Sequence, residues 1–379
     1  MGKVETHLTE QLGKVEWGEY KLGELFEVQT SKKRFDANKV EILGYGHPYV
    51  VRTALNNGIK GFLNEDPYYL NEGNTISFGQ DTATMFYQKQ PYFTGDKIKI
   101  LKAKNDKFGE KNAQFFISLI TKAFSTFSWG NTSFNVKVIE NQTILLPTQN
   151  GKIDFDFMEN FISQLEAFRL SQLEAYLLAT GLKDYTINLE ENQVVMDFES
   201  EKVQWGEFKF EDIFDTIKQG RRLKKEDQIE GDIPFVMAGI TNTGVVNYIS
   251  NPVASFPKNS ITIDIFGNAF YRNYDFGAGD DTGVYWNTQK ILPKEAMLFL
   301  TKASEKALEG KFSYGKKLRS SQSLKFKMAL PTKNNTPDYN YMALLISAIQ
   351  KLVIKDVVLY ADRKIAATKH IIESNNTKR

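Results

Sequence analysis

Clusters of basic and amide side chains are the residues of this sequence best suited to chemistry with a partner molecule. They comprise Lys32, Lys33, Arg34, Arg52, Asn56 and Asn57 in the first half, and Arg221, Arg222, Lys224, Lys225, Thr241, Asn242, Lys316, Lys317, Arg319 and Gln322 in the second. Lys and Arg attract phosphates, which sets affinity and register on DNA. Arg can also hold guanine through two hydrogen bonds, and Asn or Gln can hold adenine. These residues are therefore predicted to contact double-stranded DNA; for any single cluster, a solvated surface patch is the alternative.

Residues that could support catalysis do not occur in the patterns that catalysis requires. Asp66-Pro67-Tyr68-Tyr69 is similar to the Asp-Pro-Pro-Tyr loop of adenine methyltransferases, but it lacks the second Pro and a Gly-rich cofactor site upstream, so a turn is the better interpretation. The acidic pair Asp280-Asp281 is matched only by Asp96 in the first half, which argues against a metal-dependent nuclease site. We therefore predict no catalytic residues, no metal site and no cofactor, and a protein that recognises a partner without being an enzyme itself.

The composition bounds the size and class of the protein. The 379 residues predict two domains or three, and an apolar fraction of 41% is sufficient for packed cores. There are no cysteines, which excludes disulfides and Cys-based zinc sites. The polar N-terminus shows no signal peptide and no apolar run approaches the length of a membrane span, so we expect a cytoplasmic protein without a membrane partner.

The two halves of the chain repeat the same motifs in the same order, at separations of 184 to 188 residues. The paired motifs are Val15-Glu16-Trp17-Gly18 with Val203-Gln204-Trp205-Gly206, Pro48-Tyr49-Val50 with Pro234-Phe235-Val236, Asn74-Thr75-Ile76 with Asn259-Ser260-Ile261, Phe127-Ser128-Trp129-Gly130 with Phe312-Ser313-Tyr314-Gly315, and Leu146-Pro147 with Leu330-Pro331. This period is too long for a solenoid, and two homologous domains explain it. The basic segments 30–34 and 52–57 recur at 218–225 and 238–243 with different residues. In the same way, Asn131-Thr132-Ser133 in the first half corresponds to Lys316-Lys317-Leu318 in the second. Such differences at equivalent positions are expected of two domains that read different DNA half-sites.

Each half begins with short apolar and aromatic runs that indicate β-strands. Ile98 to Leu101 and Val136 to Ile139 alternate as strands do. Asn56-Asn57-Gly58 and Asn242-Thr243-Gly244 are typical of hairpin turns, because Asn and Gly tolerate positive φ.

A long helix is predicted to follow each β-rich region, over residues 154–180 and 338–369. Apolar side chains recur at alternating steps of three and four, as in a coiled coil, and Gly181 is well placed to end the first helix. The predicted helix-pairing residues are Met158, Phe161, Leu165 and Phe168 in the first helix, and Met342, Leu345, Ile349 and Leu352 in the second. A single amphipathic helix packed on its own domain is the alternative in each case.

These elements predict an α+β fold of two homologous β-rich domains, each followed by a long helix, with the two helices paired with each other. The expected boundaries are a first domain at 1–151, a spacer helix at 152–181, a linker at 182–203, a second domain at 204–333, and a second spacer helix with the C-terminal tail at 334–379. The linker carries Glu190, Glu191, Asp197, Glu199 and Glu201, so we expect it to be exposed and to avoid phosphates.

The ordered motifs resemble the specificity (S) subunits of type I restriction–modification systems and their type IIB relatives. The resemblance covers nearly the whole chain, and it rests on Tyr20-Lys21-Leu22-Gly23-Glu24-Leu25-Phe26, Phe208-Lys209-Phe210-Glu211-Asp212-Ile213-Phe214, the segment from Gly220 to Val236, Asn242-Thr243-Gly244-Val245-Val246, Phe312-Ser313-Tyr314-Gly315 leading to Leu330-Pro331, and Leu146-Pro147 followed by Asp154-Phe155-Asp156-Phe157-Met158-Glu159.

This resemblance implies a non-catalytic subunit that recognises an asymmetric, bipartite DNA site in phage defence. Two modification subunits would carry the adenine methylation chemistry and S-adenosylmethionine, and restriction subunits would join them in type I systems. The resemblance also implies that the two β-rich domains are target-recognition domains and that the two helices pair as an antiparallel coiled coil. The paired helices would act as a ruler, since about 25 residues at 1.5 Å each span roughly 38 Å, about one turn of DNA. The alternative function is a duplicated β-rich carbohydrate- or protein-binding module, which would lack salt-sensitive DNA binding.

Overall fold

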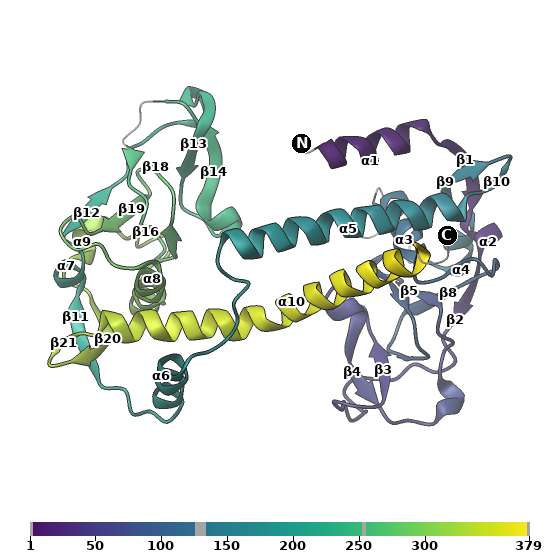
Figure 1. The fold of residues 1–379 in the computed structure, drawn as a ribbon, viewed down its shortest axis with the longest axis horizontal. Coiled ribbons are helices and arrows are strands. Elements are labelled where there is room, and N and C mark those ends of the chain that lie inside the picture. Colours follow the sequence, from purple (N-terminus) through teal and green to yellow (C-terminus); the bar gives the residue numbers. More distant parts are fainter. Residues whose placement is uncertain (1–2, 126–133, 252–254, 377–379) are drawn as a thin grey trace. The chain divides into compact units, whose positions relative to one another are not determined.

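The structure is a computed structural model that describes residues 3–125, 134–251 and 255–376. The repeated motif from Phe127 to Gly130 and the segment from Asn131 to Ser133 lie outside the described residues. The chain divides into two compact units, Met1–Leu173 and Glu174–Arg379, whose elements are labelled in Figure 1. Within the described residues, no helix combines the length and the apolar character needed to cross a membrane.

Among its described residues, the first unit contains three small sheets, helices and two 3₁₀ turns (Figure 1). The strands are β1 (Glu16–Lys21), β2 (Phe26–Thr30), β3 (His47–Val50), β4 (Ile59–Leu63), β5 (Thr75–Gly79), β6 (Met85–Gln88), β7 (Phe93–Thr94), β8 (Ile98–Ala103), β9 (Thr143–Gln149) and β10 (Lys152–Ile153). The helices are α1 (Lys3–Lys14), α2 (Leu22–Leu25), α3 (Ala113–Phe124), α4 (Val136–Asn141) and α5 (Phe155–Ala179), with η1 (Asn56–Gly58) and η2 (Pro67–Tyr69). The last turns of α5, after Leu173, belong to the second unit.

The second unit has the same kinds of elements. The strands are β11 (Trp205–Lys209), β12 (Thr216–Gln219), β13 (Glu230–Val236), β14 (Val245–Ile249), β15 (Ser255–Phe256), β16 (Ser260–Asp264), β17 (Ala269–Arg272), β18 (Phe276–Ala278), β19 (Thr282–Trp286), β20 (Lys327–Lys333) and β21 (Thr336–Pro337). The helices are α6 (Leu189–Glu199), α7 (Phe210–Ile213), α8 (Lys294–Leu308), α9 (Ser320–Ser323) and α10 (Tyr339–Asn376), with η3 (Lys225–Asp227) and η4 (Thr241–Gly244).

The sheet topology confirms the predicted duplication and the mixed α and β class. Strand orders β1-β9-β10, β2-β8-β5-β6 and β4-β3-β7 in the first unit correspond to β11-β20-β21, β12-β19-β16-β17 and β14-β13-β18 in the second, where β15 is added at one edge. In both units the third sheet contains one parallel pair of strands: Val50 faces Thr94 across β3 and β7, and Val236 faces Ala278 across β13 and β18. This shared register identifies equivalent positions in the two units.

The repeated Trp-Gly motif has a packing explanation. Trp17 pairs with Pro147 across β1 and β9, and Trp205 pairs with Pro331 across β11 and β20. A Cβ atom on the next residue, Gly18 or Gly206, would lie 2.6 Å from a threonine methyl group on the facing strand in either unit. Glycine is therefore required at this position because the two strands approach closely.

Each unit is built around one helix that covers the four-stranded sheet. In the first unit, Phe116, Ile120 and Phe124 lie on one face of α3 and are buried against sheet residues such as Phe26 and Phe78. In the second unit, α8 buries a similar apolar face in the equivalent core. Neither α3 nor α8 was predicted from the sequence, although their apolar residues recur at helical spacing.

The predicted hairpin turns are confirmed, and one predicted strand is wrong. Asn56–Gly58 joins the antiparallel strands β3 and β4, and residues 242–244 join β13 and β14. The segment from Ile98 to Leu101 lies in β8 as predicted, but Val136 to Ile139 lies in the helix α4. Asn135 explains the difference, since its side-chain oxygen accepts a hydrogen bond from the Val138 amide at 3.0 Å and caps the helix.

Both long helices are present, and their first turns pack within their own units. α5 and α10 begin within a residue of the predicted starts, and Gly181 adopts a φ of 71° just after α5 ends. Met158 is fully buried in the core of the first unit, and Met342 is fully buried in that of the second. Packing inside each unit therefore accounts for two of the predicted helix-pairing residues, whereas Ile349 and Leu352 are exposed by 41% and 49%.

The segment predicted to be an exposed acidic linker instead contains α6, which packs on α10. Asn188 and Glu191 form a reciprocal cap at the start of α6. Glu191 is only 2% exposed and accepts hydrogen bonds from Ser347 Oγ at 2.6 Å and Lys351 Nζ at 2.9 Å. The expectation of exposure is therefore wrong for Glu191, while Glu190, Glu199 and Glu201 are exposed.

Replacing Glu191 with Gln should loosen the contact between α6 and α10, with a cost of about 1–3 kcal/mol for leaving the Lys351 ammonium without its carboxylate. Burial alone would raise the pKa of Glu191, but hydrogen bonds from Lys351 and Ser347 outweigh it and lower the pKa. The stabilisation should therefore be full above the ordinary Glu pKa and should be lost as the pH falls through the lowered value. Hydrogen exchange in α6 against pH measures this; Glu190→Gln is the exposed control, and equal protection in both variants would contradict the assignment.

Candidate nucleic-acid interface

An open groove in the first unit collects part of the predicted basic set. It lies where the third sheet meets the loops around it, and it is lined by Arg34, Phe35, Asp36, Ala37, Tyr49, Val51, Arg52, Lys60, Thr82, Gly95 and Asp96. We call it groove 1. Lys60 comes from β4, Val51 directly follows β3, and Gly95 directly follows β7.

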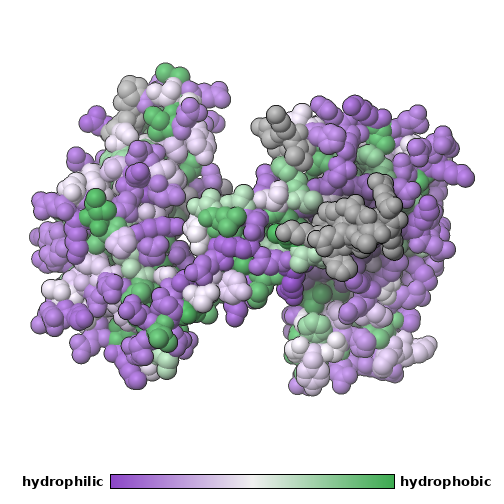
Figure 2. Space-filling view, viewed as in Figure 1, coloured by the Kyte–Doolittle hydropathy of each residue, from purple (hydrophilic) through white to green (hydrophobic). Residues whose placement is uncertain are grey.

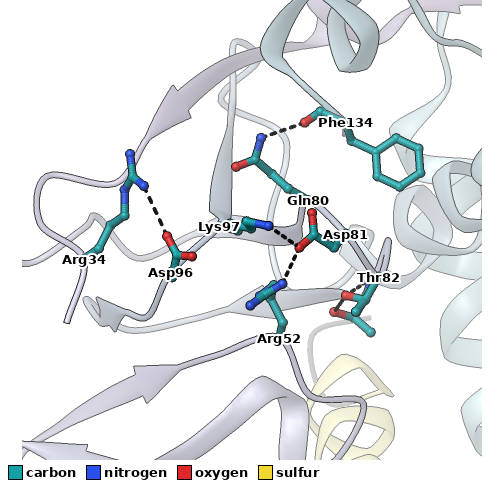
Figure 3. Close-up of polar contacts among 9 residues, drawn as sticks. Arg34, Arg52, Gln80, Asp81, Thr82, Asp96, Lys97 and Phe134 are labelled. Carbon is teal, nitrogen blue, oxygen red and sulfur yellow. Dashed lines mark hydrogen bonds and ion pairs between the residues drawn. The ribbon is translucent and has the colours of Figure 1, made fainter. Parts of the chain in front are cut away.

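Carboxylates orient the guanidinium groups of groove 1. Arg52 and Lys97 both bond Asp81, the latter at 2.8 Å, and Arg34 lies 3.2 Å from Asp96 (Figure 3). Pairs as exposed as these contribute little to stability, so their main effect is to restrict the directions in which the side chains point. A guanidinium held in one direction is suited to reading the edge of a base.

A second groove lies in the second unit. It is lined by Arg222, Leu223, Lys224, Lys225, Gln228, Met237, Val246, Asn247, Ile265, Asp280, Asp281, Lys317 and Arg319. We call it groove 2. Arg319 Nη1 donates to the carbonyl of Asp280 at 2.6 Å, and the amide of Arg221 donates to the carbonyl of Ala278 at 2.8 Å, which ties both basic loops to the end of β18.

The two grooves occupy equivalent places in the two units. By the register of the third sheet, Val51 corresponds to Met237, Lys60 to Val246, and Asp96 to Asp280. Groove 1 is lined by three cationic and two acidic side chains, and groove 2 by five cationic and two acidic side chains. The same framework therefore presents different chemistry, and groove 2 should attract phosphates more strongly.

The structure brings together less than half of the predicted DNA-contact residues. All sixteen are exposed, and those that line the grooves are Arg34, Arg52, Arg222, Lys224, Lys225, Lys317 and Arg319. Lys33 instead lies over the rings of Phe35 and Tyr69, with its Nζ 4.6 and 4.5 Å from their centroids. Five other predicted residues line neither groove: Lys32, Arg221, Thr241, Lys316 and Gln322. Lys32 Nζ donates a hydrogen bond to the Tyr68 carbonyl at 3.4 Å, and the Gln322 side chain accepts one from the Arg319 amide at 3.1 Å.

The three asparagines predicted to contact DNA also hold the turns together. The side-chain nitrogen of Asn56 donates to the carbonyl of Ile59 at 3.0 Å, and that of Asn242 donates to Val245 at 3.2 Å. The side-chain nitrogen of Asn57 donates to Tyr87 at 3.1 Å. Each of these bonds uses one of the two N–H donors of its amide, so these side chains have a structural role in the turns, and their contact with adenine stays a prediction.

Several side chains in or beside the grooves were not predicted from the sequence. Lys60, Gln228 and Asn247 line them, and Asp81 and Lys97 form the ion pairs beside groove 1. Each is a single polar residue outside any charge cluster, so only the pairing of the strands brings it to the groove. The alternation of side chains along the hairpin of β3 and β4 is the one signal that could have identified Lys60.

The candidate catalytic motifs have structural roles. Asp66 accepts a hydrogen bond from the Tyr68 amide at 3.0 Å and starts the short turn η2, as the turn interpretation predicted. Among the described residues, no group of three or more His, Cys, Asp or Glu side chains is placed to hold a metal ion.

The surface drawn in Figure 2 is mostly hydrophilic on both units, with apolar residues scattered between the hydrophilic ones.

Comparison with known proteins assigns the chain to a family. A model of the type I restriction modification DNA specificity domain matches it twice, over residues 14–175 and 202–366. A specificity subunit of a type II restriction enzyme, S.BcgI of Heyndrickxia coagulans, is 28% identical over 347 residues, which cover 90% of this chain and 96% of that protein. The crystal structure of a type I restriction–modification S subunit from M. genitalium has a similar fold, with a TM-score of 0.58 at 15% identity over 95% of each chain. The chain therefore belongs to the family of type I restriction modification DNA specificity domains, of which it carries two copies, and it is a specificity subunit of a restriction–modification system.

Proposed function

We propose that this chain reads one asymmetric, bipartite DNA sequence and directs partner subunits to it without catalytic activity of its own. The observation that carries this proposal is the pair of equivalent grooves with different linings. Two identical grooves would read a symmetric site, whereas these two differ at positions such as Lys60 and Val246. Groove 1 would read one half-site and groove 2 the other, through the residues that line them.

The two long helices α5 and α10 are proposed to pair as an antiparallel coiled coil that fixes the spacing of the half-sites. The heptad pattern supports this pairing, with Leu165, Phe168, Ile349 and Leu352 as its central residues. Within the second unit, Lys183 Nζ bonds Glu174 at 2.8 Å in the last turns of α5 and also bonds Asp362 on α10, which supports an association at that end.

The proposed partners are two methyltransferase subunits, which bind S-adenosylmethionine and methylate adenine, and, in a type I system, restriction subunits. The relatives differ on this point, because S.BcgI is named as a subunit of a type II restriction enzyme and the M. genitalium protein as a subunit of a type I system. The proposal holds for either arrangement, since in both the specificity chain supplies the DNA sequence and the partners supply the reaction.

Methylome sequencing of the source strain, with the gene intact and with it deleted, tests the proposed function. We expect one methylated motif to disappear on deletion and to consist of two different short sequences separated by an unread spacer. Restoring the gene on a plasmid should restore the motif. A methylome that does not change on deletion would refute the proposal.

Replacing Ile349 with Asp should weaken the complex with the modification subunits roughly tenfold, because an apolar side chain of the proposed helix pair is lost. The methylated sequence should stay the same, since both grooves are intact. Val353→Asp is the matched control, because Val353 is more exposed, at 72%, and lies off the heptad stripe. Isothermal titration with the modification subunit measures both; equal weakening by the two variants would contradict the pairing.

A further inference from the structure

The turns between β3 and β4 and between β13 and β14 have an unfavourable backbone. Asn56, Asn57 and Gly58 have φ values of 47°, 55° and 76°, and Asn242, Thr243 and Gly244 have 47°, 52° and 84°. We call residues 56–58 and 242–244 the left-handed turns. Three consecutive left-handed residues are uncommon, and a β-branched residue such as Thr243 is especially strained there. A conformation of this kind persists only where surrounding groups hold it.

One buried polar side chain holds each turn from the same place in the sheet. Gln88, which is 3% exposed, donates from Nε2 to the Asn57 carbonyl at 3.1 Å and to Ser77 Oγ at 3.2 Å. Arg272, which is 1% exposed, donates from Nη2 to the Thr243 carbonyl and from Nη1 to Thr243 Oγ1 at 3.1 Å. Gln88 pairs with Thr75 across β5 and β6, and Arg272 pairs with Ser260 across β16 and β17, so the two residues are equivalent.

The chemistry of this support differs between the units. Gln88 is neutral, whereas Arg272 carries a positive charge. The hydrogen bonds of its guanidinium within the described residues go to neutral groups, including Thr262 Oγ1 at 3.0 Å and the Tyr274 hydroxyl at 3.1 Å. Burial lowers the pKa of Arg272, consistent with the cost of placing a charge there. Among the described residues, no salt bridge joins Arg272 to a carboxylate. A costly buried cation at this position is explained if the turn that it bonds must stay closed.

The left-handed turns connect the walls of the two grooves. The first lies between Val51 and Lys60, which both line groove 1, and the second lies between Met237 and Val246, which both line groove 2. Beside each turn an apolar side chain is presented to solvent: Leu55 is 75% exposed and Ile240 is 72% exposed. A rigid turn at this place fixes the geometry of the groove walls and of these apolar side chains.

We propose that Gln88 and Arg272 are positioning residues for sequence recognition, each of which locks the left-handed turn beside one groove and so sets the discrimination of one half-site. The inference rests on the proposed function. It predicts that loss of the lock changes the choice of DNA sequence in one half-site, because a loosened turn accommodates mismatched base pairs more easily.

The experiment restores the deleted strain with chains that carry Gln88→Met or Arg272→Met, which keep much of the side-chain volume and remove the hydrogen bonds. The readout is the ratio of methylation at the full motif to methylation at sites with one mismatched half. We expect Gln88→Met to lower that ratio about tenfold for one half-site only, and Arg272→Met to do so for the other. General destabilisation would lower methylation at matched and mismatched sites together and leave the ratio unchanged.

A second variant separates the hydrogen bonds from the fold. Arg272→Gln should retain more discrimination than Arg272→Met, because it keeps hydrogen-bond donors at the same position in the sheet. If the unaltered chain gives a bipartite motif and Gln88→Met and Arg272→Met leave both ratios unchanged, the positioning role is refuted; if the unaltered chain gives no such motif, the proposed function itself fails.

Discussion

Replacing Arg52 with Ala should reduce discrimination at one half-site by about 10–100-fold, the range expected for one well-placed two-bond contact to a base. Arg52 lines groove 1, and Asp81 holds its guanidinium in place, so its loss removes an oriented pair of donors. The other half-site should be read as before, because groove 2 is unchanged. Competition binding with duplexes that carry single changes in each half-site, taken from the methylated motif, measures the effect.

Lys33 provides the control for Arg52 within the same unit. Lys33→Ala removes one positive charge as well, but Lys33 lies over the rings of Phe35 and Tyr69 and does not line groove 1. Discrimination should therefore change little in Lys33→Ala. Equal loss in the two variants, or an effect of Arg52→Ala on both half-sites, would show that charge rather than the groove determines recognition.

Replacing Lys224, Lys225 and Lys317 with Ala together should weaken binding to all sequences in parallel, while the preference for the motif is largely kept. These lysines line groove 2, where positive charge exceeds that of groove 1. Each lost phosphate contact should reduce the slope of log affinity against log salt by about 0.9, so the slope should fall by up to about 3. Fluorescence anisotropy of a labelled duplex over a range of salt concentrations gives this slope.

The matched control replaces Lys302, Lys306 and Lys327 with Ala. These lysines are exposed, belong to the same unit and carry the same total charge, but they do not line groove 2. Their loss should change the salt slope by much less than the loss of the groove lysines. A similar slope for both triple variants would mean that the phosphates lie elsewhere.

Much of the fold could be predicted because its signals are local or repeated. Five matched motif pairs in the same order predicted the duplication, and the structure explains the Trp-Gly pair by the close approach of β1 to β9 and of β11 to β20. Asn56-Asn57-Gly58 predicted a turn because few residues tolerate positive φ. The long helices followed from the regular spacing of their apolar residues and from Gly181 at the end of α5.

The parts that sequence reasoning missed depend on contacts between distant residues. The acidic segment before the second repeat was expected to be exposed. Instead, Glu191 accepts hydrogen bonds from Ser347 and Lys351, more than 150 residues later in the chain, and α6 packs on α10. The same limit applied to the grooves. Basic clusters predicted Arg52 and Lys317, but only the sheet register adds Lys60, and only side-chain contacts show that Asn56 supports its own turn.

Methylome sequencing of a strain whose only copy of this gene carries Arg52→Ala in groove 1, beside one with Arg222→Ala in groove 2, tests the central claim most directly. If each groove of this duplicated scaffold reads its own half of the site, the first strain should show a motif that has become degenerate in one half, and the second a motif that has become degenerate in the other half. Degeneracy of the same half in both strains, or an unchanged motif in both, would contradict the account.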